Sequence, residues 1–241
     1  MTTLFISDLH LEANRPEIAD QFLRFLETEA LHAERLYILG DLFESWVGDD
    51  DPIEQYAWIK LALRKLTRRD VPVFFMHGNR DFMIGEVFAE ETGVTVIEDP
   101  SIIEIYGNSV LLSHGDAYCT DDVEYQGMRE MSRNPEWQAM MLGKSLEERL
   151  LFAAQARATS KASSSSIKED ITDVNTDAID EALRAAGVYI MVHGHTHRPA
   201  VHDFVVDGQP ARRIVLGDWY DQGSVIRWDE NGPVLASMSR E

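Results

Sequence analysis

The chain has 241 residues, of which 44% are hydrophobic and 27% charged. These fractions are ordinary for a folded protein, and they exclude wholesale disorder, collagen-like repeats and coiled-coil fibres. Asp and Glu number 42 against 22 Lys and Arg, which gives a formal net charge of −20. This balance argues against nucleic acid as a partner, because phosphate binding needs clustered cations.

Cellular location is indicated by cysteine usage and by the first residues. Cys119 is the only cysteine, so no disulfide can form within the chain, as expected in a reducing cytosol. The first apolar run breaks at Ser7 and Asp8 without a basic stretch before it, so we expect no signal peptide. No apolar run approaches the roughly 18 residues of a membrane span. We expect a cytoplasmic protein, at most attached to a membrane surface, with no obligate protein partner.

Short apolar runs recur along the chain, and several end in a polar cluster. Runs of three to six apolar residues bounded by glycine are typical of buried strands. Such runs occupy 4–6, 36–39, 71–76, 110–112, 189–192 and 214–216. Polar residues just past strand ends are how α/β proteins build their sites. We therefore expect one site assembled from segments that are far apart in the sequence.

Helical patterns lie between these strands. Apolar residues keep helical spacing after Pro16, and the Asp-Pro pair at 51–52 is typical of the start of a second helix. Helices over 82–92 and 176–186 should each end at the glycine that follows. Beyond residue 200 the pattern predicts mainly strands and turns.

The stretch 120–187 has a different, mainly helical pattern. An Asn-Pro pair at 134–135 begins an apolar segment that continues to Phe152, and the polar tract 160–166 is typical of a flexible segment. We expect this stretch to be a helical cap inserted over the site, with a linker or surface excursion as the alternative. The core would then comprise residues 1–119 and 188–241.

Five polar clusters follow the predicted strands. In order they are Asp8-Leu9-His10, Gly40-Asp41, Gly78-Asn79-Arg80-Asp81, His114-Gly115-Asp116 and Gly194-His195-Thr196-His197. Each supplies a carboxylate, an amide oxygen or an imidazole, the ligand mixture that suits Mn, Fe and Zn. Singly, each cluster is explained by a turn, a surface pair or a packed core histidine. Together, each after a strand, they indicate a metal site.

The order of these clusters resembles the calcineurin-like metallophosphoesterase superfamily, whose motifs run D-x-H, GD, GN-[HR]-[DE], H and GH-x-H. The resemblance implies an α/β (α+β) fold, a double β-sheet sandwich flanked by helices, with two divalent metal ions at the strand ends. One ion would be held by Asp8, His10, Asp41 and His197. The second would be held by Asp41, Asn79, His114 and His195. Asp41 would bridge the two ions, and Mn2+ is the metal that we expect.

Arg80 departs from the commonest superfamily pattern, which has His after the Asn. A guanidinium cannot act as a general acid, but it binds phosphate bidentately. This favours a leaving group that needs little protonation, such as a phosphate monoester anion leaving from a pyrophosphate.

Arg80 and several longer stretches resemble the family of UDP-2,3-diacylglucosamine pyrophosphohydrolases of lipid A biosynthesis. The matching stretches are 37–50, 77–82, 119–122, 190–199 and 209–211. The resemblance implies water attack at the α-phosphorus of UDP-2,3-diacylglucosamine, giving UMP and 2,3-diacylglucosamine 1-phosphate. The catalytic residues would be Asp41, Asn79, Arg80, His114 and His195.

The same resemblance implies substrate contacts and a lipid-facing cap. The substrate would be contacted by Asn79, Arg80, Asp122, Tyr125, Ser160, Ser164 and His195. The position of the family's lysine holds Ile167, which leaves Lys168 as the neighbouring candidate. Family caps tend to be basic, whereas residues 121–187 hold 8 Lys and Arg against 13 Asp and Glu. Peripheral attachment to the cytoplasmic face of the inner membrane would therefore rest on apolar contacts.

Three alternatives stay open at this point. The apolar cap residues between Trp137 and Leu146 suit the inner face of a packed helical pair as well as they suit an acyl-chain groove. The second alternative is a phosphoesterase acting on a soluble nucleotide or phosphodiester, against which the amphipathic cap and Arg80 argue. The chain would otherwise be a catalytically dead scaffold, against which the full set of ligand residues argues.

Overall fold

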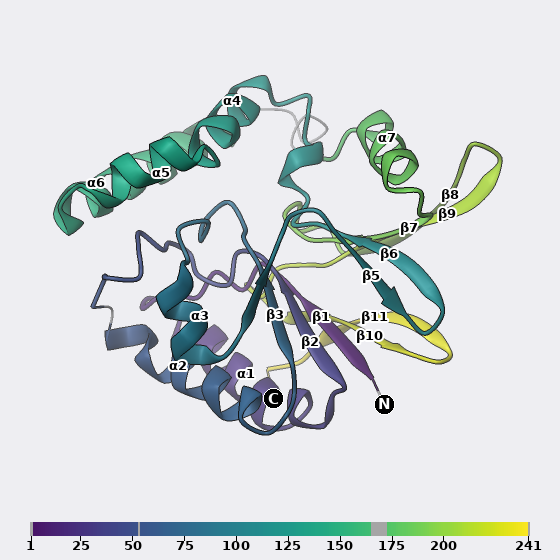
Figure 1. Cartoon of the computed structure of the whole chain (residues 1–241), viewed down its shortest axis with the longest axis horizontal. Coiled ribbons are helices and arrows are strands. Elements are labelled where there is room, and N and C mark those ends of the chain that lie inside the picture. Colours follow the sequence, from purple (N-terminus) through teal and green to yellow (C-terminus); the bar gives the residue numbers. More distant parts are fainter. Residues whose placement is uncertain (1, 53, 165–172, 241) are drawn as a thin grey trace.

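Two β-sheets form the centre of the fold (Figure 1). The computed structural model describes residues 2–52, 54–164 and 173–240, without the side chains of 54–55 and 159–164. The first sheet has the order β11 (Gly232–Met238), β10 (Gly223–Asp229), β1 (Thr3–Ile6), β2 (Arg35–Leu39), β3 (Val73–Met76), β4 (Thr95–Ile97). The second has the order β5 (Ser101–Ile105), β6 (Asn108–Leu112), β7 (Ile190–His193), β9 (Gln209–Val215), β8 (Ala200–Val206).

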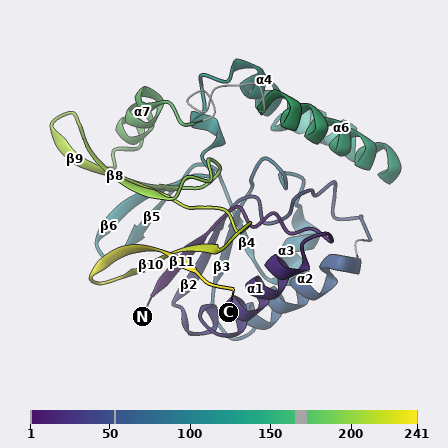
Figure 2. The ribbon, with the colours of Figure 1, turned by 180° about the vertical axis from the view of Figure 1, so that it is seen from behind.

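Helices cover the outer faces of both sheets and the side on which the strands of the first sheet end (Figures 1 and 2). They are α1 (Pro16–Glu27), α2 (Glu54–Thr67), α3 (Glu86–Thr92), α4 (Val123–Ser132), α5 (Pro135–Leu142), α6 (Leu146–Ser164) and α7 (Thr176–Ala186). The fold is therefore the predicted α/β sandwich of two sheets flanked by helices.

Three apolar clusters hold these layers together. Phe5, Leu112 and Ile226 belong to the cluster between the two sheets. A second cluster packs α1, α2 and α3 on the first sheet, and a third packs α7 on the second sheet, with Leu183 against Met191. Because the central strands are covered on both faces, they read in the sequence as continuous apolar runs.

Strand direction gathers the polar clusters at one edge. β1, β2 and β3 are parallel neighbours in the first sheet, and β6 and β7 are parallel neighbours in the second. The carboxyl ends of these five strands therefore lie together, each followed by one of the polar clusters found in the sequence.

Two helices begin later than predicted. α2 starts at Glu54 because residues up to 51 form a turn, in which the Asp51 N–H donates to the Gly48 carbonyl. α3 starts at Glu86 because the N–H of the preceding Gly85 donates a hydrogen bond to Oδ1 of Asp49 rather than to a helical carbonyl. A local turn before α2 and a tertiary hydrogen bond before α3 have thus replaced the first turns that the sequence pattern favours.

The described part of the polar tract, 160–164, differs from its prediction because it belongs to α6, whereas 165 and 166 lie outside the described residues. Elongating an existing helix through Ala, Lys and Ser costs little compared with nucleating a new one. The other predicted ends are confirmed: α5 begins at Pro135 behind the Asn134 cap, and Gly93 and Gly187 end their helices with left-handed backbone.

The position of the inserted helices is clear from two opposite views. α4 and α6 lie across the side on which the strands of the first sheet end, whereas α7 lies over the second sheet (Figures 1 and 2). The stretch 120–187 therefore contains one helix packed on the core and others placed over the strand ends.

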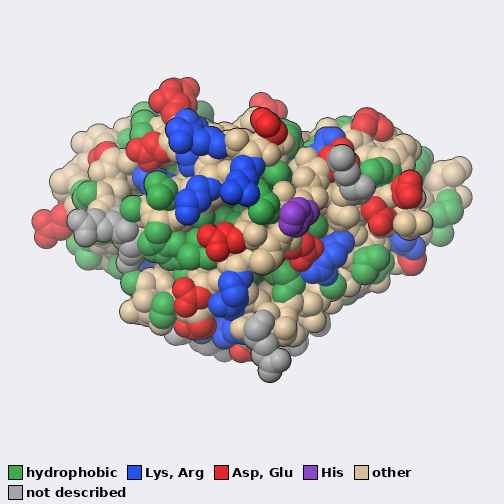
Figure 3. Space-filling view, turned by 90° about the horizontal axis from the view of Figure 1, so that it is seen from below, with side chains coloured by type: hydrophobic (Ala, Val, Ile, Leu, Met, Phe, Trp, Pro, Cys, Tyr) green, Lys and Arg blue, Asp and Glu red, His purple; other side chains and the backbone are tan. Residues whose placement is uncertain are grey.

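The opposite face of the molecule is mixed in charge. Figure 3 shows Lys and Arg side chains gathered among Asp and Glu on the face seen from below. The end of α2 and the residues after it carry three exposed cations, Lys65, Arg68 and Arg69. Within the described residues, no helix has the length and apolar character needed to cross a bilayer.

Candidate metal centre

Seven side chains predicted as metal ligands converge at the strand ends. Asp8 and His10 follow β1, and Asp41 follows β2. Asn79 follows β3, and His114 follows β6. His195 and His197 follow β7. The structure thus brings together every residue of the predicted ligand set.

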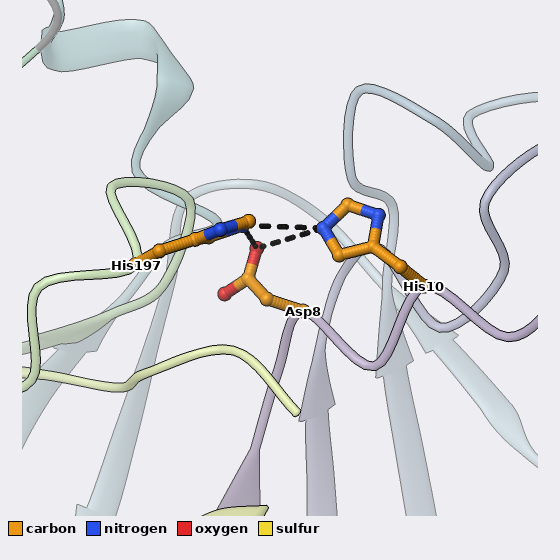
Figure 4. Close-up of side chains that lie close together, drawn as sticks. All are labelled: Asp8, His10 and His197. Atoms are coloured by element: carbon orange, nitrogen blue, oxygen red, sulfur yellow. Dashed lines mark hydrogen bonds and ion pairs between the residues drawn. The ribbon is translucent and has the colours of Figure 1, made fainter. Parts of the chain in front are cut away.

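The first group of ligands is shown in Figure 4, where three side chains point toward one another. Nε2 of His10 and Nε2 of His197 are 3.2 Å apart. Oδ1 of Asp8 lies 3.4 Å from Nε2 of His197, and Oδ2 of Asp41 lies 3.7 Å from Nε2 of His10. One oxygen of Asp41 therefore faces this group.

The second group lies on the other side of Asp41. Oδ1 of Asn79 is 3.0 Å from Nε2 of His114 and 3.0 Å from Nδ1 of His195. Oδ1 of Asp41 lies 3.7 Å from Nε2 of His114. The two carboxylate oxygens of Asp41 thus face different groups, which is the arrangement that a bridging ligand requires.

Backbone strain is concentrated at the same residues. Five ligands have left-handed backbone, with φ between 50° and 67°: Asp8, His10, Asp41, His195 and His197. Such conformations are unfavourable for residues with a side chain and persist only where surrounding contacts impose them. Backbone hydrogen bonds do so here, since the amides of Asp8 and His10 donate to the carbonyls of Gly40 and Asp41.

Close backbone approach explains one of the glycines. A Cβ at Gly78 would stand 2.0 Å from Oδ1 of Asp41, far inside contact distance. Only glycine lets the loop after β3 lie against the carboxylate.

The donor chemistry of the site fits divalent cations. Asp8 is fully buried, and its Oδ2 accepts hydrogen bonds from the Ser7 hydroxyl and the His195 N–H. Its Oδ1 is buried without a hydrogen-bond partner and faces His10 and His197. A buried anionic oxygen without a partner is costly, so a cation is the ligand that this position needs.

The titration of the histidines supports the same interpretation. Burial lowers the pKa of His114, but Asp41, Asp116 and Asp8 outweigh it and raise the pKa to about 9. Burial also lowers the pKa of His197, but the carboxylates of Asp218 and Asp8 outweigh it and raise this pKa to about 10. The carboxylates therefore hold protons on two imidazoles, an electrostatic demand that divalent cations would meet.

Comparison with known proteins agrees with this site. Residues 1–199 match the family model of the calcineurin-like phosphoesterases. A UDP-2,3-diacylglucosamine hydrolase of Stenotrophomonas maltophilia (strain R551-3) is 51% identical over 248 residues, which cover 100% of each chain. One of the same name from Xanthomonas axonopodis pv. citri (strain 306) is 46% identical over 246 residues, 99% of this chain and 100% of the relative. The chain belongs to the UDP-2,3-diacylglucosamine hydrolase family of calcineurin-like phosphoesterases.

Outer carboxylates orient two of the histidines in this phosphoesterase. Oε2 of Glu44 lies 2.9 Å from Nδ1 of His10, and Oδ2 of Asp218 lies 3.3 Å from Nδ1 of His197. Each contact leaves Nε2 facing the metal position, as is usual for metal-binding histidines. The sequence prediction did not include Glu44 or Asp218. The Gly-Asp pair after the apolar run 214–216 was a usable signal for Asp218.

Asp81 holds the ligand loops of the hydrolase in place. Its Oδ1 accepts a hydrogen bond from the Gly78 N–H at 2.8 Å, and its Oδ2 accepts one from the Leu42 N–H at 2.7 Å. Burial and the nearby Asp41 raise the pKa of Asp81 to about 7. The residue acts on the backbone of the two loops rather than as a ligand.

Asp116 connects the second ligand group to the inserted helices. The buried Oδ2 of Asp116 accepts a hydrogen bond from the Tyr125 hydroxyl at 2.9 Å and lies 3.0 Å from Nε of Arg129. Arg133, one turn further along α4, donates to the Gly78 carbonyl at 2.9 Å. Helix α4 is therefore fixed to the loops that carry His114 and the residues after β3.

A pocket with about 530 Å3 of empty space, part of it open to solvent, lies between the ligand loops and the inserted helices. Asn79 and Arg80 line it beside the metal ligands, and Trp137, Met141 and Phe152 line it from α5 and α6. Met140 and Leu142, in contrast, are about half exposed. Met141 and its neighbours in the pocket thus form an apolar wall that continues to the site.

The remaining predicted substrate contacts are placed unevenly. The ring of Tyr125 lies 5.6 Å from that of His195, at the site. Asp122 caps α4, where its side chain accepts a hydrogen bond from the Tyr125 N–H. Ser160 and Ser164 lie in the last turns of α6, with side chains outside the described part, and Lys168 lies outside the described residues.

Proposed function

We propose that this chain hydrolyses UDP-2,3-diacylglucosamine at its pyrophosphate bond. Water would attack the α-phosphorus, and the products would be UMP and 2,3-diacylglucosamine 1-phosphate. The observation that carries this proposal is the apolar pocket opening on Asn79 and Arg80. A substrate that joins a diphosphate to two acyl chains needs such a pocket directly beside a phosphate-binding metal centre.

The proposed cofactors are two divalent ions, with Mn2+ as the physiological metal. When bound, such a pair lowers the pKa of a shared water and stabilises negative charge on the oxygens of an in-line displacement. The seven residues described above would hold the ions. Asp41 would bridge them through its two oxygens, which already face different ligand groups.

Arg80 has the position and chemistry to bind the diphosphate. Its guanidinium lines the pocket, and its buried Nε has no hydrogen-bond partner among the described residues. A bidentate, charge-assisted contact to phosphate would satisfy these donors. The leaving group after attack at the α-phosphorus is 2,3-diacylglucosamine 1-phosphate, a phosphate monoester anion, so the reaction needs no general acid at this position.

The apolar wall would receive the acyl chains. Each buried methylene contributes about 0.8 kcal/mol, and Trp137, Met141 and Phe152 offer the apolar surface on which it is gained. Leu150 and Leu151, which are exposed on α6, would support peripheral contact with the inner-membrane surface. In this proposal the stretch 120–187 is the cap, and 1–119 with 188–241 form the core.

The test is a hydrolysis assay on the purified, Mn2+-loaded protein. The diacylated nucleotide is compared with a UDP-sugar that lacks acyl chains and with a generic phosphodiester. We expect the diacylated substrate to be hydrolysed with the largest kcat/KM. Preference for a soluble nucleotide would favour the alternative phosphoesterase, and no turnover of any substrate would favour a scaffold without activity.

A further inference from the structure

A second groove reaches the metal centre from the side opposite the cap. It has about 800 Å3 of empty space, part of it open to solvent. At one end it is lined by His197 and Asp218, a predicted ligand and its outer carboxylate. From there it extends past Asp221 and Gln222 to Ser237 on β11.

The order of strands places the two grooves on opposite sides of the site. Asp8 and His10 follow β1, the central strand of the first sheet. The pocket under the cap is built on residues that follow β2 and β3, on one side of β1. The second groove is built on β10, β11 and the loop before them, on the other side.

The bond that is cut divides the substrate into two unlike halves. If the lipid half occupies the pocket beside Arg80, the nucleotide half must extend across the metal centre. The second groove begins at that point, at His197. We propose that this groove is the binding subsite for the nucleoside in the nucleotide half of the substrate, an inference that rests on the proposed function.

The charge of the groove supports a neutral occupant. None of its lining residues is Lys or Arg, and two of them, Asp218 and Asp221, are carboxylates. A second phosphate-binding site is disfavoured there by repulsion. The apolar side chains of Pro199, Leu235 and Ala236 lie among polar ones, so the groove suits a flat, partly apolar base. A ribose and a base, which carry hydroxyls and amide-like groups without charge, suit this lining.

The side chains in the groove match the groups of a pyrimidine nucleoside. A carboxylate such as Asp221 can accept hydrogen bonds from both ribose hydroxyls, as acidic residues do in dinucleotide sites. Gln222 carries both a donor and an acceptor, and Ser237 adds a hydroxyl. Such groups can pair with the alternating acceptors and donor on the edge of a uracil ring.

The first test fills the groove. Ser237 is exposed on the edge strand, so S237W should place an indole in the groove without disturbing the core. The matched control is V234W on the same strand, at an exposed position that does not line the groove. UMP binding to the Mn2+-loaded proteins is measured by calorimetry. We expect S237W to weaken UMP binding at least about tenfold, the discrimination typical of a filled pocket, and V234W to bind as the wild type does.

A second test uses the ribose hydroxyls. The wild type should bind UMP more tightly than 2′-deoxy-UMP, and D221N should lose that preference because the amide accepts fewer hydrogen bonds. The control is E230Q, an exposed acidic residue at the other end of the β10–β11 hairpin. Its preference should match that of the wild type.

These measurements separate the inference from the function on which it rests. UMP binding unchanged in S237W would overturn the subsite, even if the diacylated nucleotide is hydrolysed. Loss of UMP binding together with equal loss of generic phosphodiester turnover would also overturn it, since the metal centre would then be disturbed. Failure of the wild type to hydrolyse the diacylated nucleotide would overturn the proposed function, whatever the variants bind.

Discussion

Arg80→Ala should remove only the side-chain contacts of Arg80, because its backbone hydrogen bonds do not depend on the guanidinium. The Arg80 N–H donates to Oδ1 of Asp41 at 2.8 Å, and the Arg80 carbonyl accepts a hydrogen bond from the Trp46 N–H at 3.1 Å. Neither contact needs the guanidinium. Truncation should therefore remove the phosphate contact while leaving the bridging carboxylate and the loop in place.

The expected loss follows from the chemistry of the contact. A bidentate, charge-assisted interaction with a phosphate that gains charge is worth about 2–4 kcal/mol of transition-state binding. At 1.36 kcal/mol per factor of ten, kcat/KM should fall roughly 30- to 1000-fold. Arg80→Lys should recover only part of this loss, because an ammonium keeps the charge without the planar pair of donors.

The assay is steady-state hydrolysis of the diacylated nucleotide at saturating Mn2+, with metal content measured in the same preparations. Arg184→Ala is the control, since that exposed arginine pairs with Asp207 away from the site. Full activity of the lysine variant, with normal metal content, would refute the phosphate-binding role of Arg80. Loss of metal in Arg80→Ala would show that the side chain supports the ligands instead.

Three further predictions concern the metals and the cap. Asp41→Ala should abolish turnover and reduce bound Mn2+, measured by metal analysis, because it removes the bridge; turnover near that of wild type would contradict two-metal binding. Glu44→Gln should weaken Mn2+ retention about 10- to 100-fold in a chelator titration, because the carboxylate that orients the metal-binding His10 is lost. An unchanged titration would show that Glu44 does not support metal binding. Replacing Trp137 and Met141 by polar residues of similar size should lower hydrolysis of the diacylated substrate at least about tenfold, which corresponds to ~1.4 kcal/mol. Hydrolysis of a generic phosphodiester should stay unchanged. Equal loss of activity on the two substrates would show that Trp137 and Met141 are core packing residues.

The sequence was most informative where a residue's role depends on its position along the chain. Strands buried on both faces read as apolar runs, and the parallel connections carry their ends to one edge, so Asp8, Asp41 and His114 could be grouped from the sequence alone. The glycine ends of α3 and α7 were predictable for the same reason, because a left-handed residue after a helix is a local requirement.

Features set by distant partners were not predictable. The start of α3 is set by Asp49, whose side chain accepts a hydrogen bond from the Gly85 N–H, 36 residues further along the chain. Glu44 and Asp218 act by touching histidines from other segments, at distances that spacing does not encode. The placement of Trp137, Met141 and Phe152 around one pocket likewise depended on how α5 and α6 cross.

The attachment of α4 through Asp116 has a consequence for protein engineering. Asp116 is two residues from His114, and the helix that it binds through Tyr125 and Arg129 is the first of the inserted helices. A buried carboxylate is thus one of the links between the inserted helices and the loop that carries His114. A cap exchanged between related phosphoesterases would have to bring matching partners for this carboxylate, so chimeras cut between Asp116 and α4 should perform worse than chimeras that transfer both together.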